Sequence, residues 1–201
     1  MLTENELIKF RRELHSYPET GWCEFVTTHK IVEKLRSFGL DPIYGRQVIN
    51  PEFVAGRNPA KVEEAKKAAL EKGVPPEFIE SMQDYTGVAA IFETGRPGSV
   101  LAIRFDMDCV DVDEAHEAGH RPFDEGWAST NPGHMHSCGH DGHATMGIAV
   151  CNWIQENLDQ FCGTIKVVFQ PAEEGVRGAR PMTETGIFDD VDFFFGNHLG
   201  F

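Results

Sequence analysis

From Thr86 onward the chain alternates apolar runs of strand length with a helical segment, and this alternation limits the possible folds more than any other feature. Four runs predict strands: residues 86–93 (TGVAAIFE), 99–105 (SVLAIRF), 163–169 (GTIKVVF) and 191–196 (VDFFFG). Residues 142–158 have the apolar spacing of a helix and lie between the second and third runs. This order predicts an α/β fold, with a sheet covered by helices on both faces.

Turn and cap residues predict how the other segments are arranged. Residues 94–98 (TGRPG) join the first two predicted strands and are typical of a hairpin turn, so we expect those strands to pair. Thr3 and Glu6 form a capping box for a first helix, and a second helix is expected at about residues 23–38.

A charged stretch at about residues 45–85 interrupts this pattern and resembles an insertion. It contains predicted helices at residues 60–72 and 77–84, separated by glycine and proline. We expect a solvated helical hairpin on the surface, with a subunit contact as the alternative.

Composition excludes some partners. The 201 residues carry a net charge of −14, which argues against binding to nucleic acid or to an anionic membrane surface. No stretch has the apolar length of a membrane span, and the acidic N-terminal residues lack the apolar core of a secretory signal. The five cysteines form no CxxC pair. We therefore expect one domain with free thiols in the cytoplasm.

Residues 134–143 (HMHSCGHDGH) hold four imidazoles and one thiol within ten positions. Cys138 and His140 are two residues apart, a spacing that places both side chains on one side of an extended segment. A thiolate and an imidazole together suit a borderline-soft divalent metal, and Gly139 and Gly142 would let the backbone turn around it. Alone, the stretch fits a histidine-rich surface loop equally well.

Acidic and imidazole side chains also follow the predicted strands: Asp106, Asp108, Glu173, Glu174 and His198. Functional groups of open α/β sheets gather at the carboxyl ends of strands. Adjacent Glu173 and Glu174 point in different directions, so one can bind a metal while the other acts as a general base. Each residue alone could be an ordinary polar loop residue, and the pair could be a solvated acidic turn.

Two of these segments, residues 135–143 and 170–175 (QPAEEG), resemble the amidohydrolase branch (subfamily D) of the M20 metallopeptidases. Residues 104–108 (RFDMD) and 196–198 (GNH) are similar to further motifs of that branch. The resemblance implies a zinc-peptidase-like mixed sheet flanked by helices. It also implies that residues 1–201 are the N-terminal part of a catalytic domain, without the lid and dimerisation domain.

The resemblance assigns roles to nine side chains. It implies four metal ligands: Cys138, His140, Glu174 and His198. It implies four side chains that support them: Asp106, Asp108, Asp141 and His143. Glu173 would be the general base, and Cys138 the bridge between two divalent cations. The thiolate favours zinc, while the other ligands admit manganese, which the resemblance suggests.

The implied reaction is metal-assisted hydrolysis of N-acyl or N-aroyl amino acids, with p-aminobenzoyl-glutamate as the leading candidate. The expected partners are this small molecule and a homo- or hetero-oligomer with a second hydrolase subunit. One alternative is a catalytically incomplete metal-binding fragment or regulatory subunit. A structural zinc module is a weaker alternative, because a structural site would have no use for the spare carboxylate that adjacent Glu173 and Glu174 provide. The apolar run 193–195 leads us to expect self-association unless a partner covers it.

Overall fold

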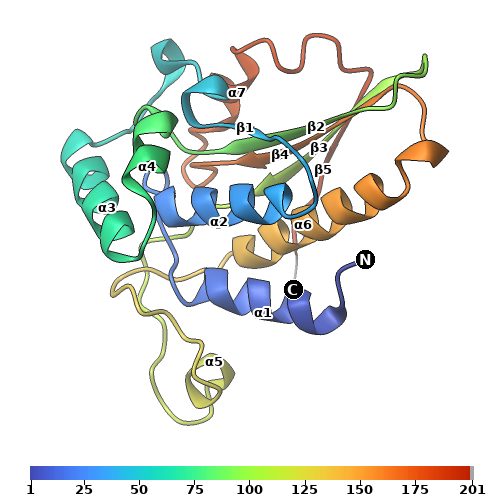
Figure 1. Cartoon of the computed structure of the whole chain (residues 1–201). Coiled ribbons are helices and arrows are strands. Elements are labelled where there is room, and N and C mark those ends of the chain that lie inside the picture. The colour runs from blue at the N-terminus through green and yellow to red at the C-terminus, as the bar shows by residue number, and fades with distance from the viewer. Residues whose placement is uncertain (200–201) are drawn as a thin grey trace.

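The computed structural model describes residues 1–199, and its centre is a five-stranded mixed sheet (Figure 1). The strands are β1 (Ile43–Tyr44), β2 (Val88–Glu93), β3 (Val100–Asp106), β4 (Thr164–Gln170) and β5 (Phe193–Gly196), in the order β1-β2-β4-β3-β5. Strands β3, β4 and β5 are parallel, whereas β1 and β2 are antiparallel to their neighbours. The predicted mixed α/β sheet is confirmed.

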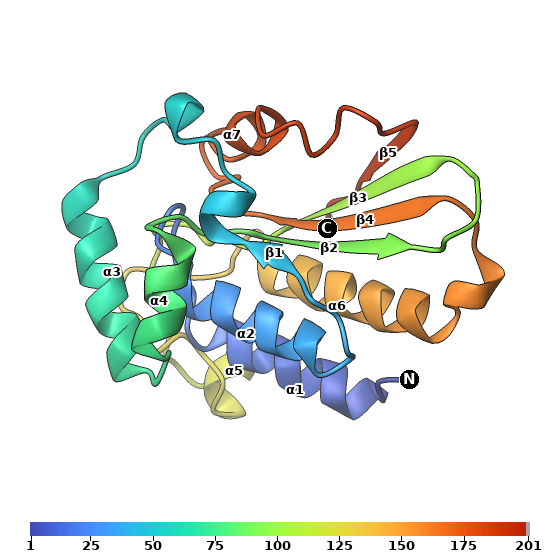
Figure 2. The ribbon, with the colours of Figure 1, turned by 45° about the horizontal axis from the view of Figure 1, so that its top comes forward.

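The helices cover the two faces of the sheet unequally. They are α1 (Glu4–His15), α2 (Phe25–Arg36), α3 (Pro59–Glu71), α4 (Pro76–Met82), α5 (Arg121–Asp124), α6 (His140–Glu156) and α7 (Ala179–Thr183). Helices α2 and α6 lie against one face, with α1 beyond them (Figure 2). The other face carries α7 and the chain that follows it (Figure 2). Ile91 is 40% exposed, and its partner on β4, Lys166, donates a hydrogen bond to the Ile187 carbonyl in that chain. The prediction that both faces are covered holds fully for one face only.

Three 3-10 turns, Gly45–Gln47, Pro51–Phe53 and Leu158–Gln160, complete the regular structure. Within residues 1–199 there is no helix with the length and apolar character needed to cross a membrane.

The first two helices begin for different reasons. Thr3 and Glu6 form the predicted capping box at α1. Helix α2 begins at Phe25, two residues later than predicted, and its own N-cap residue makes no capping hydrogen bond. The carboxylate of Glu19 instead accepts hydrogen bonds from the backbone N–H groups of Val26 and Thr27, at 3.0 and 2.8 Å. A residue from the preceding loop therefore caps α2.

The predicted hairpin at residues 94–98 is wrong. Strands β2 and β3 are consecutive in the chain, but β4 lies between them in the sheet. The loop crosses the start of β4, where Gly163 donates to the carbonyl of Arg96 (2.8 Å) and accepts from the N–H of Thr94 (3.2 Å). Gly163 has φ +78°, and a Cβ there would lie 2.1 Å from the Ser99 carbonyl oxygen. A glycine is required for this close crossing.

The charged stretch forms both predicted helices, α3 and α4, but it is less solvated than expected. Val62, Phe78 and Met82 project from these helices into the core and are buried. The stretch therefore has an apolar inner side that packs on the rest of the molecule, including α2.

Candidate metal centre

The carboxyl ends of the three parallel strands meet the N-terminal end of α6. Asp106 and Asp108 lie at the end of β3, Glu173 and Glu174 follow β4, and His198 follows β5; Cys138 and His140 lie at the start of α6. Parallel strands place their carboxyl ends at one edge, so residues distant in sequence become neighbours.

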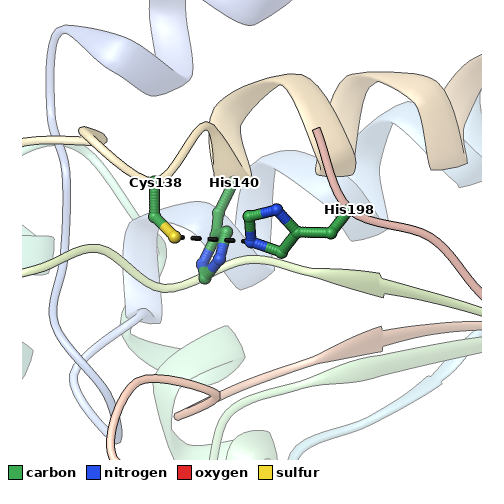
Figure 3. A group of neighbouring side chains, drawn as sticks. All are labelled: Cys138, His140 and His198. Carbon is green, nitrogen blue, oxygen red and sulfur yellow. Dashed lines mark hydrogen bonds between the residues drawn. The ribbon is translucent and has the colours of Figure 1, made fainter. Parts of the chain in front are cut away.

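The side chains of Cys138, His140 and His198 point toward one another (Figure 3). Their potential ligand atoms all lie within 4.8 Å of one another, and Cys138 Sγ is 3.4 Å from His198 Nε2. The spacing of Cys138 and His140 does not act through an extended segment, as we had expected. The chain turns at Gly139, whose φ is +81°, and His140 is the first residue of α6.

The two glutamates form a second group around the same imidazole. His140 Nε2 lies 3.9 Å from a carboxylate oxygen of Glu173 and 3.9 Å from one of Glu174. Their ligand atoms again lie within 4.8 Å of one another. The structure thus brings all four predicted ligands and the predicted base to one place, with His140 common to both groups.

The hydrogen bonding of these groups fits a bound cation. Within residues 1–199, His140 Nε2 and Glu174 Oε1 are buried and have no hydrogen-bond partner. A buried polar atom without a partner costs free energy, which a cation between them would recover. The donor set of one thiol, two imidazoles and carboxylates suits divalent zinc or manganese.

Asp108 orients both His140 and Glu174. His140 Nδ1 lies 2.9 Å from the Asp108 carbonyl oxygen and 3.2 Å from its carboxylate, which leaves Nε2 directed into the site. The other carboxylate oxygen accepts a hydrogen bond from the backbone N–H of Glu174 at 3.0 Å. This is the supporting arrangement often found behind metal-binding histidines.

Asp106 and His143 support the segment that carries His198. His143 Nδ1 lies 3.2 Å from an Asp106 carboxylate oxygen, and His143 Nε2 accepts from the backbone N–H of Leu199 at 2.9 Å. Asp106, His140 and His143 also lie close enough to share an ion. Both nitrogens of His143 already have partners, however, so a supporting position is the simpler interpretation.

Asp141 lies elsewhere than expected. Its carboxylate accepts from Arg11 Nε (3.1 Å) and the Gly142 N–H (2.8 Å), and it contacts His15 Nδ1 (2.9 Å). Its hydrogen bonds therefore hold the start of α6 to α1 rather than orienting a predicted ligand. Burial alone would raise the pKa of Asp141, but the hydrogen bond from His15 and nearby positive charge lower it to about 2.

Without a cation, the site disfavours extra negative charge. Burial, together with the nearby carboxylates of Glu174 and Glu173, raises the pKa of Cys138 to about 11. Burial also raises the pKa of Glu173, with a further contribution from the charge of Asp106. A bound cation would reverse both effects, because it stabilises the thiolate and the carboxylates.

Sequence reasoning gave no role to Glu24, which is buried beside the site. Its carboxylate accepts from the backbone N–H of Ala172 at 2.7 Å and from Thr86 Oγ1 at 2.6 Å. Ala172 has φ +48° and immediately precedes the two glutamates. Glu24 therefore fixes the turn that presents them. An acidic residue within the otherwise uncharged run at residues 20–28 was the available signal.

Comparison with known proteins agrees with this geometry. Residues 102–201 match the model of peptidase family M20/M25/M40. The chain is 47% identical to a homolog of the A-type subunit of p-aminobenzoyl-glutamate hydrolase from Haemophilus influenzae, over 98% of this chain and 47% of the relative. It is 43% identical to an indole-3-acetyl-aspartic acid hydrolase of Enterobacter agglomerans, over 97% of this chain and 45% of the relative.

Solved structures of related proteins have the same fold. An aminobenzoyl-glutamate utilization protein from Klebsiella pneumoniae has a TM-score of 0.79 and 34% identity, covering 98% of this chain and 44% of that one. A dinuclear metal-binding peptidase of the M20 family from Bacillus subtilis has a TM-score of 0.72 and 28% identity, covering 98% and 43%.

The fold is that of the α/β catalytic domain of M20 peptidases, and the side chains gathered at its strand ends could hold a metal ion. The chain belongs to the M20 peptidase family. It spans slightly under half the length of the relatives named above.

Proposed function

We propose that this chain is the N-terminal part of a metal-dependent amidohydrolase that cleaves the amide bond of N-acyl or N-aroyl amino acids. p-Aminobenzoyl-glutamate is the leading candidate substrate, which would place the protein in folate catabolism. The observation that carries the proposal is the convergence of Cys138, His140, Glu174 and His198 beside a spare carboxylate, Glu173. The relatives whose names include p-aminobenzoyl-glutamate support the choice of substrate.

In this proposal, Cys138, His140, Glu174 and His198 would hold two divalent ions, Mn²⁺ or Zn²⁺. When bound, such ions polarise an amide carbonyl and lower the pKa of water. Asp108 keeps His140 Nε2 and the Glu174 backbone in position. His143 holds the segment of His198 through the N–H of Leu199.

Glu173 performs the proton transfers in this proposal. Its side chain is partly exposed, so water and substrate can reach it. It lies beside His140 but is not needed to complete the four-ligand set. Glu173 takes a proton from the attacking water and then passes it to the leaving nitrogen. Arg104 Nη2 lies 3.8 Å from a carboxylate oxygen of Glu173, which places a positive charge beside the proposed base.

The second candidate is a catalytically incomplete fragment or regulatory subunit that keeps the metal site. The observation that favours it is the name of a relative, which describes one subunit of a hydrolase. We propose that a second hydrolase subunit, or a second copy of the chain, then completes the enzyme. The five free cysteines fit a cytoplasmic location.

The test is Glu173→Gln, measured by metal analysis and by hydrolysis of p-aminobenzoyl-glutamate. We expect turnover to fall by about 10²–10⁴-fold, as for loss of a general base, with bound metal unchanged. Glu174→Gln should lower metal content as well, whereas Glu77→Gln on the exposed side of α4 should change neither.

Each assay is run on the chain alone and with a polypeptide that corresponds to the remaining half of the relatives. Loss of metal in Glu173→Gln, with residual activity in proportion to the metal retained, would contradict the role of Glu173. Activity only with the added polypeptide would support the second candidate.

A further inference from the structure

We propose that a cavity beside Glu174 binds the side-chain carboxylate of an acidic acyl-amino acid, and this inference rests on the proposed function. The cavity has a volume of about 400 Å³. Its wall includes Trp22, Asn58, Lys61, Asp111, Glu174 and Arg177. The wall thus joins the turn after β4 to the charged stretch that contains α3.

Two cations in this wall have no acidic partner. Within residues 1–199, neither Lys61 nor Arg177 forms an ion pair, whereas nearby Lys66 pairs with both Glu63 and Asp84. The chain has 32 acidic and 18 basic side chains, so two unpaired cations in one cavity are not explained by a shortage of carboxylates. Their arrangement suits an anion supplied from outside the chain.

The backbone makes room for the Arg177 guanidinium. A Cβ on Gly56 would lie 2.9 Å from Arg177 Cδ, and one on Gly175 would lie 2.8 Å from its Nε. The guanidinium packs between these two glycines, where its one long hydrogen bond goes to the Gly56 carbonyl at 3.5 Å. Most of its five N–H groups remain available to a ligand.

The opposite wall is held in a fixed position. The indole of Trp22, itself buried, donates to the Ala55 carbonyl at 2.9 Å and ties the segment before α3 to the core. Asn58 caps α3 through its side-chain oxygen, which accepts from the Ala60 N–H at 3.0 Å. Its amide NH₂ is therefore a further donor beside Lys61.

Two acidic groups also line the cavity, but both have other partners. Glu174 is a proposed metal ligand, so a cation would share its charge. Asp111 faces His134 Nε2 at 3.4 Å. Because Glu174 borders both the metal centre and the cavity, an amide at the metal centre would direct its amino-acid side chain toward Lys61 and Arg177. The p-aminobenzoyl group carries no negative charge, so the anion comes from the amino acid.

The test compares p-aminobenzoyl-glutamate with p-aminobenzoyl-glutamine, which lacks only the side-chain charge. Calorimetry on the manganese-loaded chain in the Glu173→Gln background gives Kd without hydrolysis. We expect Lys61→Gln and Arg177→Gln each to raise Kd for the glutamate conjugate about tenfold, and to change Kd for the glutamine conjugate less than about twofold. The matched controls Lys67→Gln and Arg180→Gln, both outside the cavity, should leave both values unchanged.

Three results would overturn the subsite: equal Kd values for the two conjugates, an equal rise in Kd for both conjugates in either variant, or no binding of either conjugate. The proposed function fails separately. Charge-selective binding without hydrolysis by the unsubstituted chain, alone or with the second polypeptide, would refute the hydrolase and keep the subsite. Hydrolysis of both conjugates without preference for the charged side chain would support the hydrolase and refute the subsite.

Discussion

At the scale of single residues, two buried carboxylates of this chain hold backbone groups in place. Glu19 caps α2, and Glu24 fixes the turn before the paired glutamates. Both glutamates are buried, and within residues 1–199 neither has a positively charged side chain at hydrogen-bond distance. Burial disfavours their charged forms, so their protonation is coupled to folding.

Glu19 makes this coupling measurable. Burial raises its pKa to about 7, against an ordinary value of 4.5, even though three hydrogen bonds from Val26 and Thr27 favour the charged form. Between these pH values the folded chain keeps a proton that the unfolded chain has lost, so this contribution to stability falls as pH rises. The full loss is about 3 kcal/mol.

We therefore expect the difference in unfolding free energy between the unsubstituted chain and Glu19→Gln to fall as pH rises from 4.5 through 7. Urea unfolding at pH 5, 6, 7 and 8 measures this difference, which should level off above about pH 8. Glu77→Gln, at an exposed site, should give a difference that does not vary in the same way. A difference that stayed constant or increased with pH would show that Glu19 is ionised in the folded chain across this range.

At the scale of elements, α6 can place His140 only because it packs closely on the sheet. Gly147 makes that distance possible, since a Cβ there would lie 2.5 Å from Phe169 Cε1 and 2.8 Å from Phe105 Cδ2. Both rings come from the parallel strands that end at the metal centre. The approach of helix and sheet is therefore set by one residue without a side chain.

Gly147→Ala should lower the free energy of unfolding by about 1–3 kcal/mol through overpacking, although alanine favours helix by about 1 kcal/mol. Thermal or urea unfolding measures the change. Gly196→Ala is the control, because a Cβ on Gly196 meets nothing within 4 Å and its φ is not in the left-handed region. If Gly147→Ala were as stable as the control, α6 would have room that the structure does not show.

The positions of the strands along the chain were easier to predict than the pairing of those strands in the sheet. Local periodicity predicted β2, β3, β4 and β5 to within about two residues, since alternating and buried runs are local properties. The pairing of β2 with β4 was missed, because the turn residues at 94–98 carry no information about a strand that arrives some 65 residues later.

The site shows the same division between local and distant information. Residue type and family resemblance indicated Cys138, His140, Glu174 and His198, and the structure brings them together. The contacts of Asp141 could not be predicted, because its partners, His15 and Arg11, lie more than 120 residues away on α1. Chemical type can be inferred from sequence, but the direction of a buried side chain depends on packing between distant segments.

At the scale of the whole molecule, the sheet leaves one apolar edge exposed. Strand β5 pairs with β3 on one side and has no second neighbour among residues 1–199. Phe193, Phe194 and Phe195 on this strand are 58%, 50% and 60% exposed. Unpaired backbone groups combined with three exposed aromatic rings favour pairing with another chain.

We expect the isolated chain to self-associate through β5. Sedimentation velocity should show a weight-average sedimentation coefficient that rises with concentration, and Phe193→Lys with Phe195→Lys should reduce this rise because charge on an edge strand opposes strand pairing. Phe123→Lys on α5 is the matched control, since Phe123 is also exposed but lies on a separate helix. A folded monomer at every concentration would contradict the prediction. Association that persists in the double variant would assign it to another surface.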